Sequence, residues 1–290
     1  MNVLSSKNNV KSNERTSLLT VATSMCAALY AIGAYLTGFI PSPWGFGQFR
    51  PAVIVPSLFA IIFGPMPAAV GAAIGTLIAD SVKHGYLYPG SLLAAVPGNF
   101  VGFYLLGYIV KKKFTWERFV VASNVGLTIG NIIIAFLYVF AFKWLYAGAL
   151  PNLTFETLTF ISIGLTIWFF VTELPFILLV TPLLILATAA AAPSIMPLDL
   201  RTHSLREELP KTTFSLAMLI PGILMIIMGL AATYTQMGSL MSLNSDTLTA
   251  IQTLFYGSGV ILSILGIITY TRRKFLWLSA SQKSPETNDK

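Results

Sequence analysis

Charged residues are scarce in this chain, and their scarcity indicates its class. Of its 290 residues, 10% are charged and 55% are hydrophobic. A soluble domain carries about 25% charged residues. The composition therefore predicts an integral membrane protein with several spans.

Cysteine and histidine are almost absent. The single cysteine, Cys26, excludes an intramolecular disulfide and a cysteine metal cluster. The two histidines, His84 and His203, fall on opposite sides of the membrane in the topology derived below, so they form neither a shared metal site nor a Ser-His pair. A phosphate loop of the form G-x-x-x-x-G-K-[ST] is also missing. We therefore expect a protein without cofactor or metal that is not an enzyme.

Positive charge is in excess, at a net +7, but its distribution argues against nucleic acid as a partner. The basic residues form short clusters between apolar runs, where they set the orientation of a chain in a bilayer. Runs of roughly 20 apolar residues, the length needed to cross a bilayer, occupy residues 17–40, 91–110, 119–142, 159–188, 212–234 and 250–270. The first run is too long for a signal peptide and lacks a clear cleavage site, so we expect it to be retained.

The stretch 51–80 could form one tilted helix or two short ones, because it is interrupted by the sequence GPMP. With two helices the chain crosses the membrane eight times, and 15 basic residues lie on the cytoplasmic side against three outside. One helix would give 5 inside and 13 outside. The positive-inside rule therefore favours eight spans in the cell membrane, with both termini cytoplasmic.

This topology predicts an all-α membrane protein with a boundary in its longest inside loop. We expect a cytoplasmic tail (1–16), a six-helix solute-binding membrane domain (17–190), a cytoplasmic linker (191–211), a two-helix hairpin (212–271) and a second cytoplasmic tail (272–290).

Glu173 lies near the middle of the span 159–188, where a carboxylate is costly and usually faces a cavity or a partner. Four polar or aromatic residues continue its helix face toward the outside: Thr159, Ser162, Thr166 and Phe169. We interpret this face as the wall of a solute pocket with Glu173 at its floor. The alternatives are a protonated glutamate, a bond to a neighbouring helix, and hydroxyls that bond their own backbone. Pro175 predicts a local kink.

Other polar residues inside the spans are candidates for the same pocket. Asn131 and Tyr138 share a face of the span 119–142, although asparagines also hold membrane helices together. Asn99 follows Pro97 and Gly98 in the next span toward the N-terminus. Asp80 could equally be solvated at the outer interface, and Trp168 could stack on a planar solute or face lipid or a neighbour.

The outer loop PSPWGFGQFR (41–50) is rich in proline, glycine and aromatic residues. It could fold over a pocket as a lid that offers Trp44, Phe46, Gln48 and Arg50 to a solute. The alternative is an ordinary aromatic belt at the membrane interface.

The first span SMCAALYAIGAYL, the aromatic outer loop and the run FRPAVIVPSLFAIIFGPMPAAVGAAIGTLIAD resemble S components of energy-coupling factor (ECF) transporters. These are the substrate-binding membrane subunits of vitamin importers, and the resemblance covers residues 15–190. It implies six helices, a pocket in the outer half covered by the first outer loop, and separate coupling and ATPase subunits. It also implies that an Ala-x-x-x-Ala face, here Ala27 and Ala31, meets the coupling subunit. The last two spans depart from the family, whose members usually end after six helices.

The sequence thus predicts a subunit that binds a small vitamin-like solute, with aromatic residues and a carboxylate favouring a planar heteroaromatic ring. The expected substrate-binding residues are Gln48, Arg50, Asn99, Asn131, Tyr138, Thr166, Trp168 and Glu173. Thiamine-, riboflavin-, biotin- and queuosine-type substrates all remain open. The alternatives are a stand-alone proton-coupled secondary transporter that uses Glu173, and a membrane scaffold subunit without a ligand.

Overall fold

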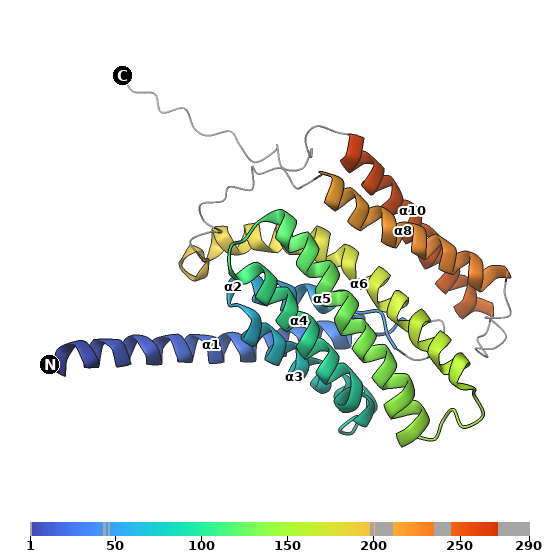
Figure 1. The fold of residues 1–290 in the computed structure, drawn as a ribbon, viewed down its shortest axis with the longest axis horizontal. Coiled ribbons are helices and arrows are strands. Elements are labelled where there is room, and N and C mark those ends of the chain that lie inside the picture. The colour runs from blue at the N-terminus through green and yellow to red at the C-terminus, as the bar shows by residue number, and fades with distance from the viewer. Residues whose placement is uncertain are drawn as a thin grey trace.

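The protein was analysed as a computed structural model, which describes residues 2–42, 45, 47–197, 200, 211–234 and 245–271. Eight α-helices, joined in places by short 3-10 or π-helical segments, make up this part of the chain (Figure 1). Between residues 2 and 191 the helices are α1 (Asn2–Thr37), α2 (Ile54–Ile62), α3 (Pro65–His84), α4 (Val96–Lys111), α5 (Trp116–Phe136) and α6 (Phe155–Ala191). The described segments after residue 210 are α8 (Lys211–Tyr234) and α10 (Ser245–Thr271).

The break between α2 and α3 confirms the two-helix interpretation of residues 51–80. Gly64 has φ +93° between the two helices, a backbone conformation that only glycine adopts without strain. Pro65 and Pro67 then lie in the first turn of α3, where their missing N–H groups cost nothing. The GPMP sequence therefore ends one helix and starts the next.

Helices α1 and α3 pack through small residues. A side chain at Gly71 would lie 2.6 Å from Cys26 Cβ, and one at Gly75 would lie 2.7 Å from the Ala27 carbonyl. Close approach of this kind stabilises helix pairs in membranes. Ala27 and Ala31 are buried inside the subunit, with 5% and 6% of their surface exposed. In this structure the small-residue face of α1 packs inside its own bundle, and its contact with a coupling subunit stays a prediction.

Four glycines bring α4 and α5 into backbone contact. Gly98 and Gly102 on α4 lie against Gly130 and Gly126 on α5, so that an added Cβ at Gly102 would meet the Gly126 carbonyl at 2.9 Å. Two of the four glycines directly precede a pocket candidate: Asn99 follows Gly98, and Asn131 follows Gly130. This contact brings the two asparagines to the same side of the bundle, where both line a small cleft between the helices.

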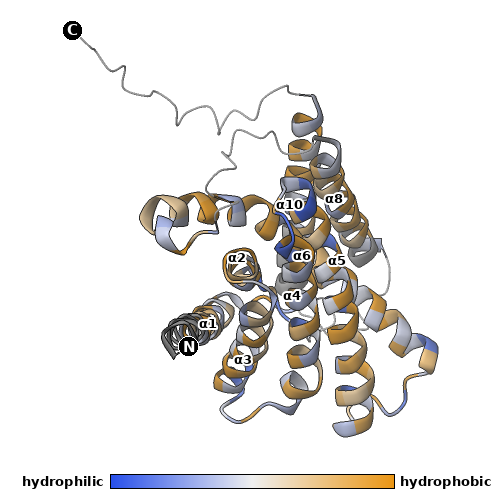
Figure 2. Cartoon of the chain, turned by 60° about the vertical axis from the view of Figure 1, so that its left-hand side comes forward, coloured by the Kyte–Doolittle hydropathy of each residue, from blue (hydrophilic) through white to orange (hydrophobic). Residues whose placement is uncertain are grey.

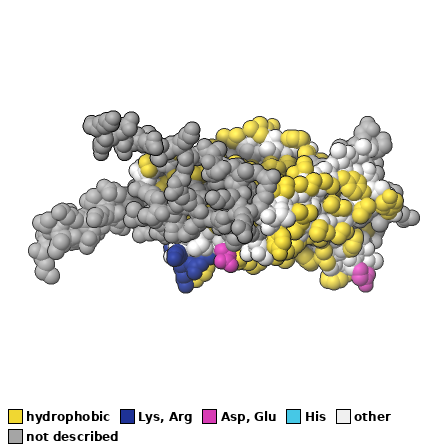
Figure 3. All heavy atoms as spheres, turned by 90° about the horizontal axis from the view of Figure 1, so that it is seen from above, with side chains coloured by type: hydrophobic (Ala, Val, Ile, Leu, Met, Phe, Trp, Pro, Cys, Tyr) yellow, Lys and Arg dark blue, Asp and Glu magenta, His cyan; other side chains and the backbone are white. Residues whose placement is uncertain are grey.

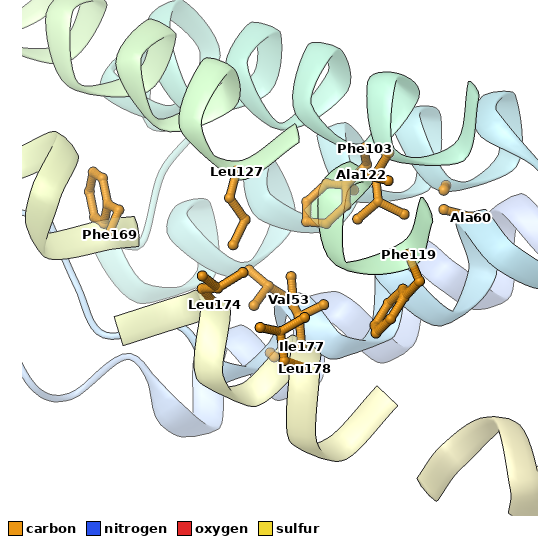
Figure 4. Close-up of a cluster of buried hydrophobic side chains, with 14 of the residues drawn as sticks. Val53, Ala60, Phe103, Phe119, Ala122, Leu127, Phe169, Leu174, Ile177 and Leu178 are labelled. Carbon is orange, nitrogen blue, oxygen red and sulfur yellow. The ribbon is translucent and has the colours of Figure 1, made fainter. Parts of the chain in front are cut away.

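Helix α6 is the longest of the bundle and changes direction along its length (Figure 1). Pro175 and Pro182 lie inside it, and each removes one backbone hydrogen bond from the helix. This agrees with the bend expected at Pro175. Below that level a buried apolar cluster joins α6 to α2, α4 and α5, with Leu127, Leu174 and Ile177 directed toward Val53 (Figure 4).

The C-terminal helices α8 and α10 form an antiparallel pair alongside α6 (Figure 1). Gly222 and Gly259 meet in backbone contact, and the Ser215 hydroxyl donates to the Gly266 carbonyl at 2.7 Å. The pair contacts the bundle through Phe255, whose ring lies edge-on to Trp168 of α6 at 5.0 Å between centroids. Both rings are fully buried, so this contact is a packed interface.

Six helices within the described residues are long and apolar enough to cross a membrane: Thr16–Thr37, Pro65–His84, Ser91–Lys111, Trp116–Tyr146, Phe155–Ala191 and Thr212–Leu230. Pro51–Ile62 and Phe255–Thr271 are shorter apolar helices. Apolar residues cover most of each helix (Figure 2), and on the face shown in Figure 3 the coloured charged side chains lie only at the margins. The all-α membrane fold predicted from the sequence is confirmed. Of the two added helices, α8 is long and apolar enough to cross a membrane, whereas the apolar part of α10, Phe255–Thr271, is shorter.

Candidate functional site

A cavity opens between the loop 41–50 and helices α3 to α6. Its cavity volume is about 50 Å³, which is smaller than the roughly 300–1,000 Å³ of typical small-molecule sites. Its lining residues come from five segments of the bundle: Gly47, Gln48, Arg50, Asp80, Gly90, Ser91, Ala95, Asn99, Ile134, Tyr138, Phe169 and Glu173.

Glu173 of α6 lines the cavity and forms an amide–carboxylate pair with Asn131 of α5 behind it. The Asn131 amide nitrogen donates to Glu173 Oε2 at 2.9 Å, and the two side chains are only 2% and 5% exposed. The sequence placed these residues at one depth, and the hydrogen bond now links them directly. Because this bond uses only Oε2 of Glu173, the other carboxylate oxygen remains as a hydrogen-bonding position at the cavity wall.

An ion pair between Arg50 and Asp80 also lines the cavity. One guanidinium nitrogen of Arg50 donates a hydrogen bond to the Thr76 hydroxyl, and the other donates to Asp80 Oδ1. Both partners lie on α3. Burial lowers the pKa of Arg50, but Asp80, Tyr30 and Glu173 together more than offset this and leave the pKa raised above its usual value. Arg50 therefore stays cationic, and its charge is compensated within the protein.

The loop 41–50 is a tight hairpin held over the cavity. The Phe49 amide donates to the Ile40 carbonyl and the Ser42 amide to the Gly47 carbonyl, each at 2.9 Å. Gly47 has φ +82°, and a side chain there would lie 2.9 Å from the Phe169 ring of α6. The hairpin therefore closes directly onto α6, which only a glycine at position 47 permits.

Gln48 ties the same hairpin to its surroundings. With its amide oriented to satisfy both neighbours, Gln48 donates to the Gly38 carbonyl at 3.1 Å and accepts from Lys83 Nζ at 2.7 Å. Lys83 also donates to the Gly38 carbonyl at 2.6 Å. Trp44 and Phe46, the other two lid candidates, lie outside the described residues.

Aromatic side chains border the cavity near the turn before α4. The hydroxyls of Tyr138 and Tyr88 are 2.7 Å apart, and the Tyr88 ring stacks on His84 at 3.7 Å. Burial raises the pKa of Tyr88 despite the hydrogen bond to Tyr138, which lowers it. The Tyr88 hydroxyl therefore remains protonated and able to hold Tyr138 in place.

The structure thus brings five of the eight expected substrate-binding residues to one cavity: Gln48, Arg50, Asn99, Tyr138 and Glu173. Asn131 lies behind this cavity, where it is hydrogen-bonded to Glu173. Thr166 and Trp168 do not line it. The Thr166 hydroxyl donates to the Ser162 carbonyl of its own helix at 2.8 Å, and Trp168 packs against Phe255. The polar stripe above Glu173 is therefore explained by the backbone alternative, since Thr159 and Ser162 also bond carbonyls four residues earlier.

Several lining residues were not among the expected substrate-binding residues. Ser91, Ala95 and Ile134 carry no unusual pattern, because serine, alanine and isoleucine are ordinary in membrane helices. Phe169 was on the Glu173 face but was not assigned a role. Asp80, considered only as a possible site, reaches the cavity because Arg50 folds back onto it.

The chain matches the family described as "ECF-type riboflavin transporter, S component" over residues 15–189. Comparisons with curated proteins and with solved structures gave no match. The matched residues contain α3 to α6 and the hairpin, and therefore every residue that lines the cavity. Since this match spans more than half of the 290 residues, the chain belongs to the S-component family of ECF-type riboflavin transporters.

Proposed function

We propose that this chain is the substrate-binding membrane subunit for uptake of a planar heteroaromatic vitamin, with riboflavin as the first candidate. Separate coupling and ATPase subunits would power the uptake, since the sequence has no phosphate loop. The observation that supports the proposal most is the cavity itself. Glu173, which is buried and hydrogen-bonded to Asn131, lines the cavity, and a glycine-rich hairpin covers it.

The chemistry of the walls suits a flat ring with polar edges. Phe169, Ile134 and Tyr138 offer apolar or aromatic surface to the faces of a ring. Asn99 and Glu173 offer hydrogen-bonding groups to its edges. Gln48 and Arg50 would close over the ligand from the hairpin. This combination of apolar walls and few directed polar groups is typical of small-molecule sites.

Orientation follows from the distribution of basic residues. The predicted cytoplasmic termini would place the hairpin 41–50 and the cavity mouth on the outer side of the cell membrane. The solute would then enter from outside, and Glu173 would mark the deepest point it reaches.

Ligand binding by the purified chain tests the proposal. Riboflavin, thiamine and biotin are titrated against the protein in detergent or nanodiscs, with quenching of flavin fluorescence or calorimetry as the readout. We expect Glu173→Gln to weaken binding at least about 10-fold, because it removes a charged hydrogen-bond acceptor while leaving an amide oxygen for Asn131. Glu156→Gln, on the exposed first turn of the same helix, is the matched control.

Affinity that is unchanged in Glu173→Gln would remove Glu173 from the site. The stand-alone transporter is tested separately, by uptake into vesicles that contain only this chain. Uptake driven by a proton gradient, without coupling and ATPase subunits, would contradict the proposed division of labour.

A further inference from the structure

The charged groups of the cavity are already paired with protein atoms, whereas one of its neutral groups is not. Arg50 is bonded to Asp80 and Thr76, and Glu173 is bonded to Asn131. Ser91, in contrast, is 1% exposed, lines the cavity, and its hydroxyl has no hydrogen-bond partner among the described residues. An unpartnered buried hydroxyl costs about 1–3 kcal/mol, so its presence at a cavity wall indicates a partner that the protein itself does not supply.

Ser91 begins a polar strip along the start of the fourth span. Ser91, Ala95 and Asn99 follow at intervals of four residues, and all three line the cavity. Residues 91–95 form a π-helical turn before α4, and such turns are frequent at functional sites. Eight residues correspond to about 12 Å along a helix axis. The strip therefore has two polar ends separated by a small, flat alanine.

A ligand that uses both ends of this strip must be elongated and flat, as a fused-ring heterocycle is. Ala95 leaves room for the ring, while Ser91 and Asn99 can each donate and accept a hydrogen bond. The opposite wall carries Phe169 and Glu173. A ring held between the strip and α6 would thus meet neutral polar groups along one edge and the carboxylate at its inner end.

The charges of the lining residues determine what such a ligand can carry. Two carboxylates, Asp80 and Glu173, and one guanidinium, Arg50, face the cavity. The only cation among the described lining residues is bonded to a carboxylate, so a phosphate group would meet no free positive charge. A doubly charged phosphate would therefore be partly buried without a cationic partner, which is unfavourable.

We propose that Ser91 and Asn99 are substrate-recognition residues, and that together with the internally paired charges they select an uncharged fused-ring heterocycle over its phosphate ester. This inference rests on the proposed function, because it concerns the same cavity. Beyond that function, Ser91 and Asn99 recognise the ligand, and the charge pattern of the cavity rejects its phosphate ester.

Titration of the full-length protein with riboflavin and with riboflavin 5′-phosphate tests the inference. We expect Ser91→Ala to weaken riboflavin binding about 3- to 10-fold, as expected for one lost neutral hydrogen bond. Asn99→Ala should weaken it at least as much, and Ala95→Leu should abolish it because the larger side chain fills the strip. Ser123→Ala is the matched control, since Ser123 is equally buried but bonds its own backbone at Phe119. The phosphate ester should bind at least about 100-fold more weakly than riboflavin to the unaltered protein.

The outcomes separate the two proposals. If the unaltered protein binds neither riboflavin nor another planar vitamin, the proposed function fails and this inference fails with it. If it binds one, but Ser91→Ala and Asn99→Ala behave like Ser123→Ala, only the inference is overturned. Equal affinity for riboflavin and its phosphate ester would likewise overturn the proposed charge selection and leave the proposed function intact.

Discussion

The Arg50–Asp80 ion pair fastens the hairpin 41–50 to α3, and its removal should release the hairpin. The Arg50 and Asp80 side chains are only 12% and 8% exposed. Asp80→Asn would leave the guanidinium charge buried without its carboxylate. Breaking a buried pair by removing one partner costs about 3–5 kcal/mol. We take the lower value, about 3 kcal/mol, because Arg50 keeps some contact with solvent. This free energy corresponds to about a 150-fold shift toward the open hairpin.

Hydrogen exchange of the hairpin amides measures this shift directly. The Ser42 and Phe49 amides are bonded within the hairpin at 2.9 Å, so they exchange only when it opens. In Asp80→Asn they should exchange up to about 150-fold faster, while amides of α5 keep their protection. Glu117→Gln, in the exposed first turn of α5, controls for the loss of a carboxylate elsewhere.

A double variant separates the charge from the shape of the contact. Arg50→Met combined with Asp80→Leu removes both charges and keeps apolar volume, and such replacements are often neutral or stabilising. It should return the exchange rates of the hairpin toward those of the unaltered protein. If Asp80→Asn leaves these rates unchanged, the ion pair does not hold the hairpin and the reasoning is refuted.

Two further predictions concern packing. Gly130→Ala should lower the thermal unfolding midpoint of the purified protein, because its Cβ would lie 3.0 Å from the Gly98 carbonyl. The control is Gly257→Ala, which meets no atom within 4 Å and should leave the midpoint unchanged or raise it. Equal effects of the two variants would contradict the close contact of α4 and α5. Phe255→Ala should destabilise the contact between α10 and α6 by about 3 kcal/mol, because it removes a fully buried ring. The effect is measured as faster proteolysis or faster hydrogen exchange of α8 and α10 relative to α3. Uniform protection in both regions would argue against that contact.

The helices could be predicted from the sequence because their causes are local. Apolar runs gave the spans, GPMP gave the break between α2 and α3, and the basic clusters indicated that this break divides two crossings. The resemblance to S components rested on the same local features, and the family match now confirms it. The segment 212–234 coincides with α8, apart from one residue at its start.

The candidate site was less predictable because side-chain partners depend on tertiary packing. Asn131 and Glu173 could be placed at one depth from helix lengths alone. The Arg50–Asp80 pair could not, because it depends on the path of the hairpin across α3. The hydroxyls of Ser162 and Thr166 share a face with Glu173, but each bonds its own backbone. A polar face on a membrane helix therefore indicates a cavity only when its groups lack backbone partners.

Trp168 illustrates a limit that applies to every helix with neighbours on two sides. Helix α6 lies between the cavity and the α8–α10 pair, so Phe169 faces the cavity while Trp168, one residue earlier, faces Phe255. Helical spacing assigns these two residues to different faces but does not say which face is the site. The added pair thus gives a buried role to a tryptophan that would otherwise be directed at lipid. Because Trp168 and Glu173 lie on the same stretch of α6, loosening α10 would affect the cavity only through movement of that helix.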